Sequence, residues 1–389
     1  MKVLLVHNRY QTGSPSGEDT VFEAERDLLL KNGVDVLTYT RSNDEISGLG
    51  KLSMPLRMQW SRRTYRELTE RIDREKPDIA HFHNIFYCVT PSAYDACRDR
   101  GVPVVQTLHN YRLLCANGLC LYDGHVCTDC LEDKRFGRSI ARKCFRDSSF
   151  YSAAMSRFLD RHTRQGTFTE KIDAFIALSK HQRQVYISAG FPAEKIYVKP
   201  NFLSTPIDAP PGEKKAALFV GRLSREKGIE DLIEAWERVD HPLWIVGDGP
   251  LREWLETAIR ERDLAHIRYL GRVGREDMGE LYAQALCLVF PSVWYEGMSM
   301  VILEALSAGV PILCSDAVAM APDLEQAGCA ELYPSGDSAA LAHTARDLLS
   351  RPAKYTAMGK MARGLFLEKY TAEKNWKHLY AIYTSVLQS

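Results

Sequence analysis

The sequence predicts an α/β protein built from two doubly wound domains, and three observations support this. Short apolar runs alternate with amphipathic stretches of helical spacing along almost the whole chain. This alternation occurs twice, once on each side of a proline-rich segment at residues 206–215. The length of 389 residues is that of two domains of roughly 100–200 residues each. Parallel sheets covered by helices on both faces have such sequences.

The first half contains five candidate strands, each a short run rich in β-branched residues or leucine. They are residues 3–6, 34–39, 79–82, 102–108 and 174–178. Residues 18–32 have apolar side chains at helical spacing, and Gly33 follows as a helix stop. We therefore predict strands joined by helical crossovers, which makes the sheet parallel.

The second half repeats this order after the linker. Its candidate strands are residues 217–220, 243–246, 267–270, 287–290 and 311–314, and its candidate helices are 229–239, 251–262, 278–285 and 300–308. Residues 337–388 have helical spacing throughout. We predict domains at 1–205 and 206–370, with a cysteine-rich basic insertion at about 112–165. Residues 371–389 are expected to form a helix that packs back toward the first domain.

Composition excludes several classes of protein. The 50 basic and 50 acidic residues give zero net charge, which argues against a nucleic-acid binder. The N-terminus has four consecutive apolar residues, fewer than the roughly 7–15 of a signal peptide, and no run reaches the roughly 18 that span a bilayer. We therefore expect a cytoplasmic protein whose ten cysteines are thiols or metal ligands.

The strongest functional signal follows the strand at 287–290. A loop carries Glu296 and Gly297, and a predicted helix beyond it carries Glu304. Glycine allows a ligand close to the backbone, and the N–H groups at a helix start favour an anionic diphosphate. The two carboxylates are candidate acceptors for sugar hydroxyls, although either can also be a solvated surface residue.

A second signal follows the strand at 217–220. Gly221 permits a sharp turn, and Arg222 and Lys227 can converge on phosphate oxygens. The segment lacks the spacing of a Walker loop. Ligands of doubly wound sheets bind beyond the carboxyl ends of the strands, so the expected active site is a cleft between the domains.

In order and spacing, residues 221–228, 247–250, 270–273 and 296–304 resemble the family 4 retaining glycosyltransferases. That family has the GT-B architecture, two facing Rossmann-like domains with a cleft between them. The resemblance implies a retaining transferase of hexosyltransferase type that needs no metal for catalysis. It moves a sugar from a UDP- or GDP-linked donor to a glycan or lipid-diphosphate-linked acceptor, as in bacterial surface-polysaccharide assembly.

The resemblance also implies roles for individual residues. Catalytic roles are implied for His109, Arg222, Lys227 and Glu296, and donor-binding roles for Gly17, Gly221, Val273, Gly297, Met298, Ser299 and Glu304. Met298 and Ser299 stand where many members have Phe-Gly, which leaves the donor sugar open. Glu18 and Asp19 are candidates for acceptor contact or for favourable charges in a first helical turn. His81 and His83 are weaker candidates at a strand end.

The insertion contains a cluster of cysteines. Cys127 and Cys130 form a Cys-x2-Cys pair, and Cys115 and Cys144 could complete a tetrahedral site for structural zinc. Thiol redox chemistry is the competing interpretation. Two further classes stay open: a GT-B sugar-nucleotide epimerase or phosphorylase, and a zinc-containing nucleic-acid binder, which would not explain the two carboxylates.

The zero net charge is unevenly distributed. Residues 1–200 hold 30 basic and 24 acidic residues, and residues 134–164 alone hold nine basic and two acidic ones. This segment is either a solvated basic helix or a surface for anionic lipid, with the aromatic side chains Phe145, Phe150, Tyr151 and Phe158 interleaved. The second interpretation predicts peripheral attachment to the inner face of the cell membrane.

Overall fold

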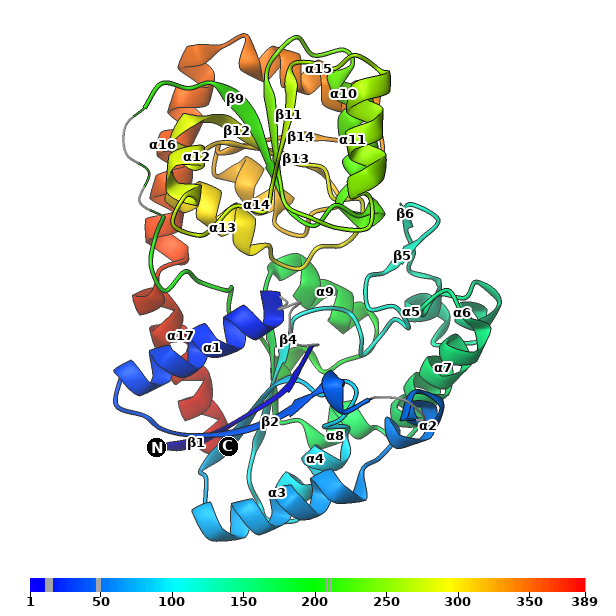
Figure 1. The fold of residues 1–389 in the computed structure, drawn as a ribbon. Helices are drawn as coiled ribbons and strands as arrows, with labels where there is room; N and C mark the ends of the chain where they lie inside the picture. Colours follow the sequence, from blue (N-terminus) through cyan, green and yellow to red (C-terminus); the bar gives the residue numbers. More distant parts are fainter. Residues whose placement is uncertain (11–16, 47–49, 208, 210–211, 389) are drawn as a thin grey trace. The chain divides into compact units, whose positions relative to one another are not determined.

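The computed structural model describes residues 1–10, 17–46, 50–207, 209 and 212–388 (Figure 1). The chain divides into two compact units. Unit 1 comprises Met1–Cys120, Thr128–Asn201 and Ala372–Ser389, and unit 2 comprises Leu121–Cys127 and Phe202–Thr371. Part of the predicted linker, residues 208, 210 and 211, lies outside the described residues.

Unit 1 is built on a six-stranded sheet in which every neighbouring pair is parallel. Its order is β2 (Asp35–Ser42), β1 (Lys2–Arg9), β3 (Ile79–Asn84), β4 (Val104–Leu108), β7 (Ala174–Ala177) and β8 (Ile196–Val198). Strands β3 and β4 are buried along their whole length, as expected for a sheet covered on both faces. The helices are α1 (Gly17–Lys31), α2 (Gly50–Arg57), α3 (Arg62–Glu75), α4 (Ser92–Arg98), α5 (Asp129–Asp133), α6 (Arg138–Ala141), α7 (Ser149–Arg164), α8 (Thr167–Lys171) and α9 (Lys180–Ser188).

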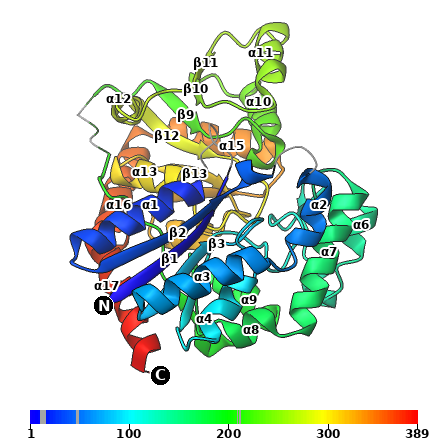
Figure 2. The ribbon, with the colours of Figure 1, turned by 60° about the horizontal axis from the view of Figure 1, so that its bottom comes forward.

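The last helix of the chain, α17 (Ala372–Gln388), belongs to unit 1. Its residues Leu379 and Tyr383 share a buried core with Val3 and Leu5 of β1. Figure 2 shows α1 on one side of β1 and β2, with α3 and α4 on the other. The sheet therefore has a helical layer on each face.

Unit 2 contains a second parallel six-stranded sheet. Its order is β11 (Ile267–Gly271), β10 (Leu243–Val246), β9 (Ala216–Val220), β12 (Ala285–Phe290), β13 (Ile312–Ser315) and β14 (Ala330–Tyr333). The helices are α10 (Ile229–Trp236), α11 (Arg252–Glu261), α12 (Met278–Gln284), α13 (Met300–Ser307), α14 (Ala321–Gln326), α15 (Ser338–Leu349) and α16 (Pro352–Lys369). Two buried clusters, one on each face, make its core.

The predicted fold class is confirmed, with three differences in detail. Each of the ten predicted strands is present, but β8 and β14 were not predicted, and neither was the hairpin of β5 (Leu121–Tyr122) and β6 (His125–Val126). The stretch 337–388 is not one continuous helix. It forms three helices, and the first break is due to Pro352, which disfavours helical backbone in the residue before it and starts α16.

Candidate active site

The strand order of unit 2 reverses between β9 and β12, which are neighbours in the sheet although two strands separate them in the sequence. In doubly wound sheets ligands bind at the carboxyl ends of the strands at such a switch point. Lys227 lies in the 3-10 turn η3 (Arg225–Lys227) after β9, and Glu296 lies in the loop after β12. The fold therefore brings two predicted catalytic residues to the expected position.

Lys227 and Glu296 are in direct contact. The Lys227 Nζ donates to both carboxylate oxygens of Glu296 at 2.7 Å, and the Ser292 hydroxyl donates to Oε2 at 2.8 Å. The ammonium also lies 5.3 Å from the ring centre of Phe290 and 5.7 Å from that of Trp294. Glu296 is buried, and in these low-dielectric surroundings its attraction to the Lys227 ammonium is stronger than it would be in water.

Gly228 makes this contact possible. Its φ of 68° is left-handed, and a Cβ atom there would stand 1.9 Å from the carbonyl oxygen of Pro291. Only glycine lets the turn after β9 approach the loop after β12 this closely. The approach is also fixed by the Val293 N–H, which donates to the carbonyl of Glu226 at 3.0 Å.

Glu304 lies inside α13, whereas Glu296 precedes the helix. The Tyr282 hydroxyl donates to Glu304 Oε2 at 2.9 Å. Burial raises the pKa of Glu304, and the hydrogen bond from Tyr282 and the charge of Arg275 only partly offset that effect. Gly297 and Ser299 are buried and Met298 is half-buried just before the helix, whose N-cap, Ser299, makes no side-chain capping bond.

The remaining predicted donor residues surround the same strand ends. Arg222 is exposed, and the described part of the chain offers it no ion pair. The Gly221 N–H donates to the Val246 carbonyl at 3.0 Å, which ties the turn to β10. Val273 follows β11 and packs against the core cluster beneath.

In unit 1 the strand order reverses between β1 and β3, and His109 follows the next strand, β4. His109 Nε2 lies 3.0 Å from His83 Nδ1, and His83 Nε2 lies 3.2 Å from Glu25 Oε1. Glu25 is completely buried and its Oε2 accepts from Lys199 Nζ at 2.8 Å. Burial alone would raise the pKa of Glu25, but Lys199 and His81 outweigh it and hold the pKa well below its usual range.

This chain of contacts favours one tautomer of His109. Because the Glu25 carboxylate can only accept, its place beside His83 Nε2 favours a proton on that nitrogen and leaves Nδ1 as the acceptor. His109 then donates from Nε2, which leaves its Nδ1 as an acceptor. Burial lowers the pKa of His83 to about 4, and burial with the neighbouring imidazoles holds that of His109 well below 6.5. His109 is therefore a neutral acceptor near neutral pH.

Glu18 and Asp19 have different surroundings. Glu18 Oε1 accepts from Asn110 Nδ2 at 2.5 Å, and its Oε2 is buried without a hydrogen-bond partner among the described residues. Burial raises the pKa of Glu18, opposed by Arg112. Asp19 instead contacts His7 Nε2 at 2.8 Å, inside the unit. Gly17 begins α1, and residues 11–16 of the predicted glycine loop lie outside the described residues.

Several side chains at these sites were not predicted. Arg112 lies over the ring of Phe86 at 5.4 Å, and Trp294 has an indole N–H for which no acceptor is found among the described residues. Arg112 follows His109 in the same segment, so its position was a usable signal. Glu25 could also have been noticed, because it places a charge among the apolar positions of α1.

His81 is a structural residue. Its Nδ1 lies 2.6 Å from the Tyr383 hydroxyl and its Nε2 lies 2.7 Å from Thr107 Oγ1. In the described ranges, Glu25, His81 and His83 form the one group of three potential metal ligands within 4.8 Å of one another. Lys199 already supplies a positive charge to this carboxylate through its Oε2, which favours a cluster held by the protein's own side chains.

The zinc site stays a prediction. Cys127 belongs to unit 2, whereas Cys115, Cys130 and Cys144 belong to unit 1. Cys115 lies beside Cys120, and hydrogen bonding from Cys120 lowers the pKa of Cys115 to about 6 despite burial.

The basic segment is only partly available to a membrane. Phe145 and Phe158 are buried in unit 1, whereas Phe150 is 55% exposed. Arg138 and Arg142 form ion pairs with Asp129. Membrane attachment therefore stays a prediction. Two of the four aromatic side chains named for it are buried and cannot contact lipid. Among the helices of the described chain, none combines the length and apolarity needed to span a bilayer.

Comparison with known families accounts for most of the sequence. Residues 205–365 match the family described as glycosyl transferases group 1, and residues 20–205 match glycosyltransferase family 4. The chain is 37% identical over 123 residues to O-antigen chain mannosyltransferase B of Escherichia coli. It is 31% identical over 166 residues to a glycogen synthase of Mycobacterium tuberculosis. These matches cover 29% and 41% of this chain and only 31% and 39% of the relatives.

Solved structures share the whole fold. A lipopolysaccharide outer core galactosyltransferase matches with a TM-score of 0.68 at 20% identity, covering 99% of both chains. Sucrose-phosphate synthase of Thermosynechococcus elongatus matches with a TM-score of 0.72 at 16% identity, over 100% of this chain and 99% of that one. The two family matches meet at residue 205 and the fold extends over both, so the protein belongs to the group 1 glycosyltransferases of family 4, with the GT-B architecture.

Proposed function

We propose that the protein is a retaining glycosyltransferase that transfers a hexose from a UDP- or GDP-linked donor to a glycan acceptor of bacterial surface-polysaccharide assembly. The observation that carries the proposal is the contact between Lys227 and Glu296 at the switch point of unit 2. Relatives named as an O-antigen mannosyltransferase and a glycogen synthase support the reaction class. A structure of Anabaena HepE with UDP and glucose, which shares the fold, supports the type of donor.

The charges of unit 2 suit departure of a nucleoside diphosphate. The C1–O bond to the diphosphate breaks, and C1 bonds to the acceptor hydroxyl oxygen on the same face of the sugar. The hydroxyl proton passes to the departing diphosphate. Arg222 and Lys227 would stabilise the growing negative charge, so catalysis would need no metal. Glu296, already held by Lys227 and Ser292, would accept hydrogen bonds from donor-sugar hydroxyls, and Glu304 from the ribose.

We assign acceptor binding to unit 1. Glu18 Oε2 and His109 Nδ1 are two acceptors able to bind hydroxyl groups. The acceptor glycan would be free or linked to a lipid diphosphate, and a lipid-linked acceptor would require the protein to work at the inner face of the membrane. The zinc site proposed for the cysteine cluster would be structural, since four thiolates leave no open coordination position.

The direct test is turnover of a panel of UDP- and GDP-hexoses by the purified protein with and without EDTA. We expect one donor to release its nucleoside diphosphate, at the same rate with and without EDTA. NMR should show that the product keeps the anomeric configuration of the donor. Lys227→Ala should reduce turnover by about 100-fold or more, as removal of a transition-state charge contact does. Arg238→Ala, exposed on the same unit, is the matched control. Full turnover in Lys227→Ala would refute the proposal.

A further inference from the structure

Unit 1 contains a cavity of about 470 Å³ that none of the roles above uses. Its wall comes from the end of β2, the 3-10 turn η1 (Asn43–Glu45), α2, the start of α3 and the segment after β3. It lies at the carboxyl ends of the strands, the edge where ligands of such sheets bind. Its volume is within the range of roughly 300–1,000 Å³ that small-molecule sites occupy.

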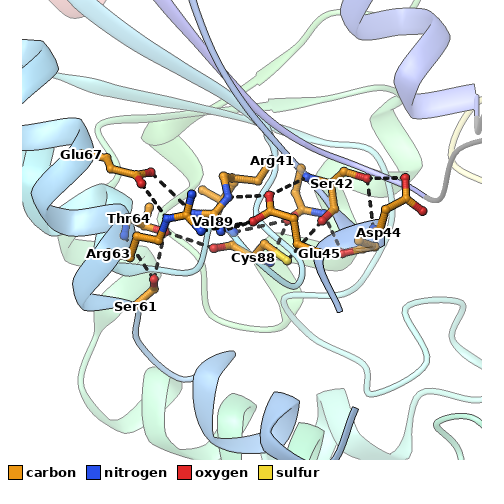
Figure 3. Close-up of polar contacts among 12 residues, drawn as sticks. Arg41, Ser42, Asp44, Glu45, Ser61, Arg63, Thr64, Glu67, Cys88 and Val89 are labelled. Carbon is orange, nitrogen blue, oxygen red and sulfur yellow. Dashed lines mark hydrogen bonds and ion pairs between the residues drawn. The ribbon is translucent and has the colours of Figure 1, made fainter. Parts of the chain in front are cut away.

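The wall of this cavity carries an excess of positive charge. Four arginines, Arg41, Arg57, Arg62 and Arg63, face one glutamate, Glu45. Figure 3 shows Arg41 and Arg63 bound to the carboxylates of Glu45 and Glu67. Arg57 and Arg62 have no carboxylate partner in the described ranges. Two guanidinium charges are therefore left for a ligand.

One of the paired arginines is also fixed in place. Arg41 Nε donates to Glu45 Oε1 at 2.7 Å, and Glu45 is itself held in a capping box with Ser42. Arg41 Nη1 is buried, and its nearest carboxylate oxygen, on Glu67, is 3.6 Å away, beyond hydrogen-bond distance. Arg41 is therefore a fixed part of the wall, and the donors open to a ligand are those of the exposed Arg57 and Arg62.

Another part of the wall is apolar and aromatic. Trp60, Tyr87 and Met54 line it, and the Trp60 indole N–H donates to Asp95 at 2.8 Å, which holds the ring. The Tyr87 ring also lies 5.8 Å from the guanidinium of Arg112. The charge of Arg112 also acts on Glu18, one of the proposed acceptor residues.

From these features we infer that the cavity binds an oxyanion, a phosphate or a carboxylate, carried by the acceptor glycan. Arg57 and Arg62 supply the charge and the hydrogen-bond donors, and the aromatic rings cover the apolar face of a sugar. Identification of the ligand as the acceptor rests on the proposed function. Oxyanion binding itself does not depend on it.

Trp60 provides a local reporter for the test. Its indole N–H resonance in the full-length protein is identified by its loss in Trp60→Phe, and is followed without any donor at low salt. Inorganic phosphate and glucuronate are the two anionic probes, and glucose is the neutral one. We expect a saturable shift with phosphate, with glucuronate or with both, and none with glucose. The stronger anion identifies the group on the acceptor.

Substitutions in the wall separate a specific site from general anion binding. Arg57→Gln and Arg62→Gln should each lower the affinity for the anion about tenfold, which is the loss expected for a charge-assisted hydrogen bond. Arg66→Gln, exposed on α3 outside the cavity, should leave the affinity unchanged. The inference would be overturned if neither anion caused a shift in the millimolar range. It would also be overturned if the variant carrying both Arg57→Gln and Arg62→Gln bound the anion as tightly as the wild type. Because no donor is present, failure of the transferase assay and failure of this test are independent results.

Discussion

At the scale of single residues, the buried carboxylate Glu25 determines the state of His109 through His83. The free energy of burying a charge is large unless the charge is paired, and Lys199 provides the pair here. Neither Glu25 nor Lys199 needs to touch a substrate for this effect. Their role is to orient an imidazole and keep it neutral.

The first prediction concerns the tautomer of His109. A long-range ¹H–¹⁵N spectrum should show its proton on Nε2 and a bare Nδ1, with no titration between about pH 6 and pH 8, since its pKa is held well below 6.5. A spectrum with the proton on Nδ1, or a titration in that range, would contradict the effect of Glu25 on His109 through His83.

The second prediction concerns removal of the Glu25 charge. Glu25→Gln leaves Lys199 buried and unpaired, so we expect a loss of about 3–5 kcal/mol in the free energy of unfolding at neutral pH. Because the pKa of Glu25 is depressed, its stabilising effect is present above about pH 4.5 and is lost as the pH falls below that value. The variant should therefore lose less stability on acidification than the wild type. Asp27→Asn, exposed on the same helix, is the control and should change little.

Glu304 provides the third prediction, with the opposite sign. Its raised pKa means that the folded protein binds this proton more tightly than the unfolded chain. Its contribution to stability is present below about pH 4.5 and is lost as the pH rises through the raised pKa. Glu304→Gln keeps the acceptor for Tyr282, so its melting temperature should equal the wild-type value at low pH and exceed it near pH 8, while donor binding weakens.

The control for Glu304→Gln is Glu256→Gln, which replaces an exposed carboxylate on α11. Its melting temperature should follow that of the wild type at both pH values, which calorimetry can show. If Glu304→Gln has the same melting temperature as the wild type at high pH as well, the free-energy cost assigned to burying the Glu304 charge is wrong.

At the scale of elements, the active-site geometry of unit 2 depends on the close approach of two loops at Gly228. The fourth prediction is that Gly228→Ala displaces the turn that carries Lys227, because its Cβ cannot stand 1.9 Å from a carbonyl oxygen. We expect turnover to fall by at least tenfold and the melting temperature to decrease. Gly364→Ala is the matched control: it lies within α16 with open space around it, so alanine should be neutral or stabilise by up to about 1 kcal/mol.

Strands could be predicted from the sequence where they consist of a continuous apolar run. Strands β9 and β12 were predicted, and with them the positions of Lys227 and Glu296. Strand β14 was not, because Glu331 interrupts it, and β8 has only three residues. The contact of Lys227 with Glu296 spans 69 residues and depends on the strand order, which local patterns do not encode.

The contacts that connect Glu25 with His109 in unit 1 could not be predicted from the sequence either. Glu25, His83, His109 and Lys199 come from four separate segments, and the spacing along the chain gives no sign that they meet. The cavity lined by arginines was missed for a related reason. Arg57 and Arg62 look like solvated surface residues in the sequence, and only the folded wall shows that they face one space.

At the scale of the whole molecule, the chain returns to its first unit for its final helix. Asn375 of α17 donates to the Pro200 carbonyl at 2.7 Å, and its Oδ1 lies 3.3 Å from Lys199 Nζ. Tyr383 lies against His81. The end of the chain thus completes both the core of unit 1 and the surroundings of the buried carboxylate.

The fifth prediction follows from this arrangement. Leu379 of α17 is completely buried in the core of unit 1, so Leu379→Ala should cost about 2–5 kcal/mol in the free energy of unfolding. Amide exchange should accelerate in β1 and β3 and stay unchanged in β9 and β12, because the cavity destabilises unit 1 alone. Leu387→Ala, 42% exposed on the same helix, should shift stability by no more than about 0.5 kcal/mol. Equal acceleration in the strands of both units would show that α17 stabilises the molecule as one cooperative body, and the division of the chain into two independently destabilised units would then be wrong.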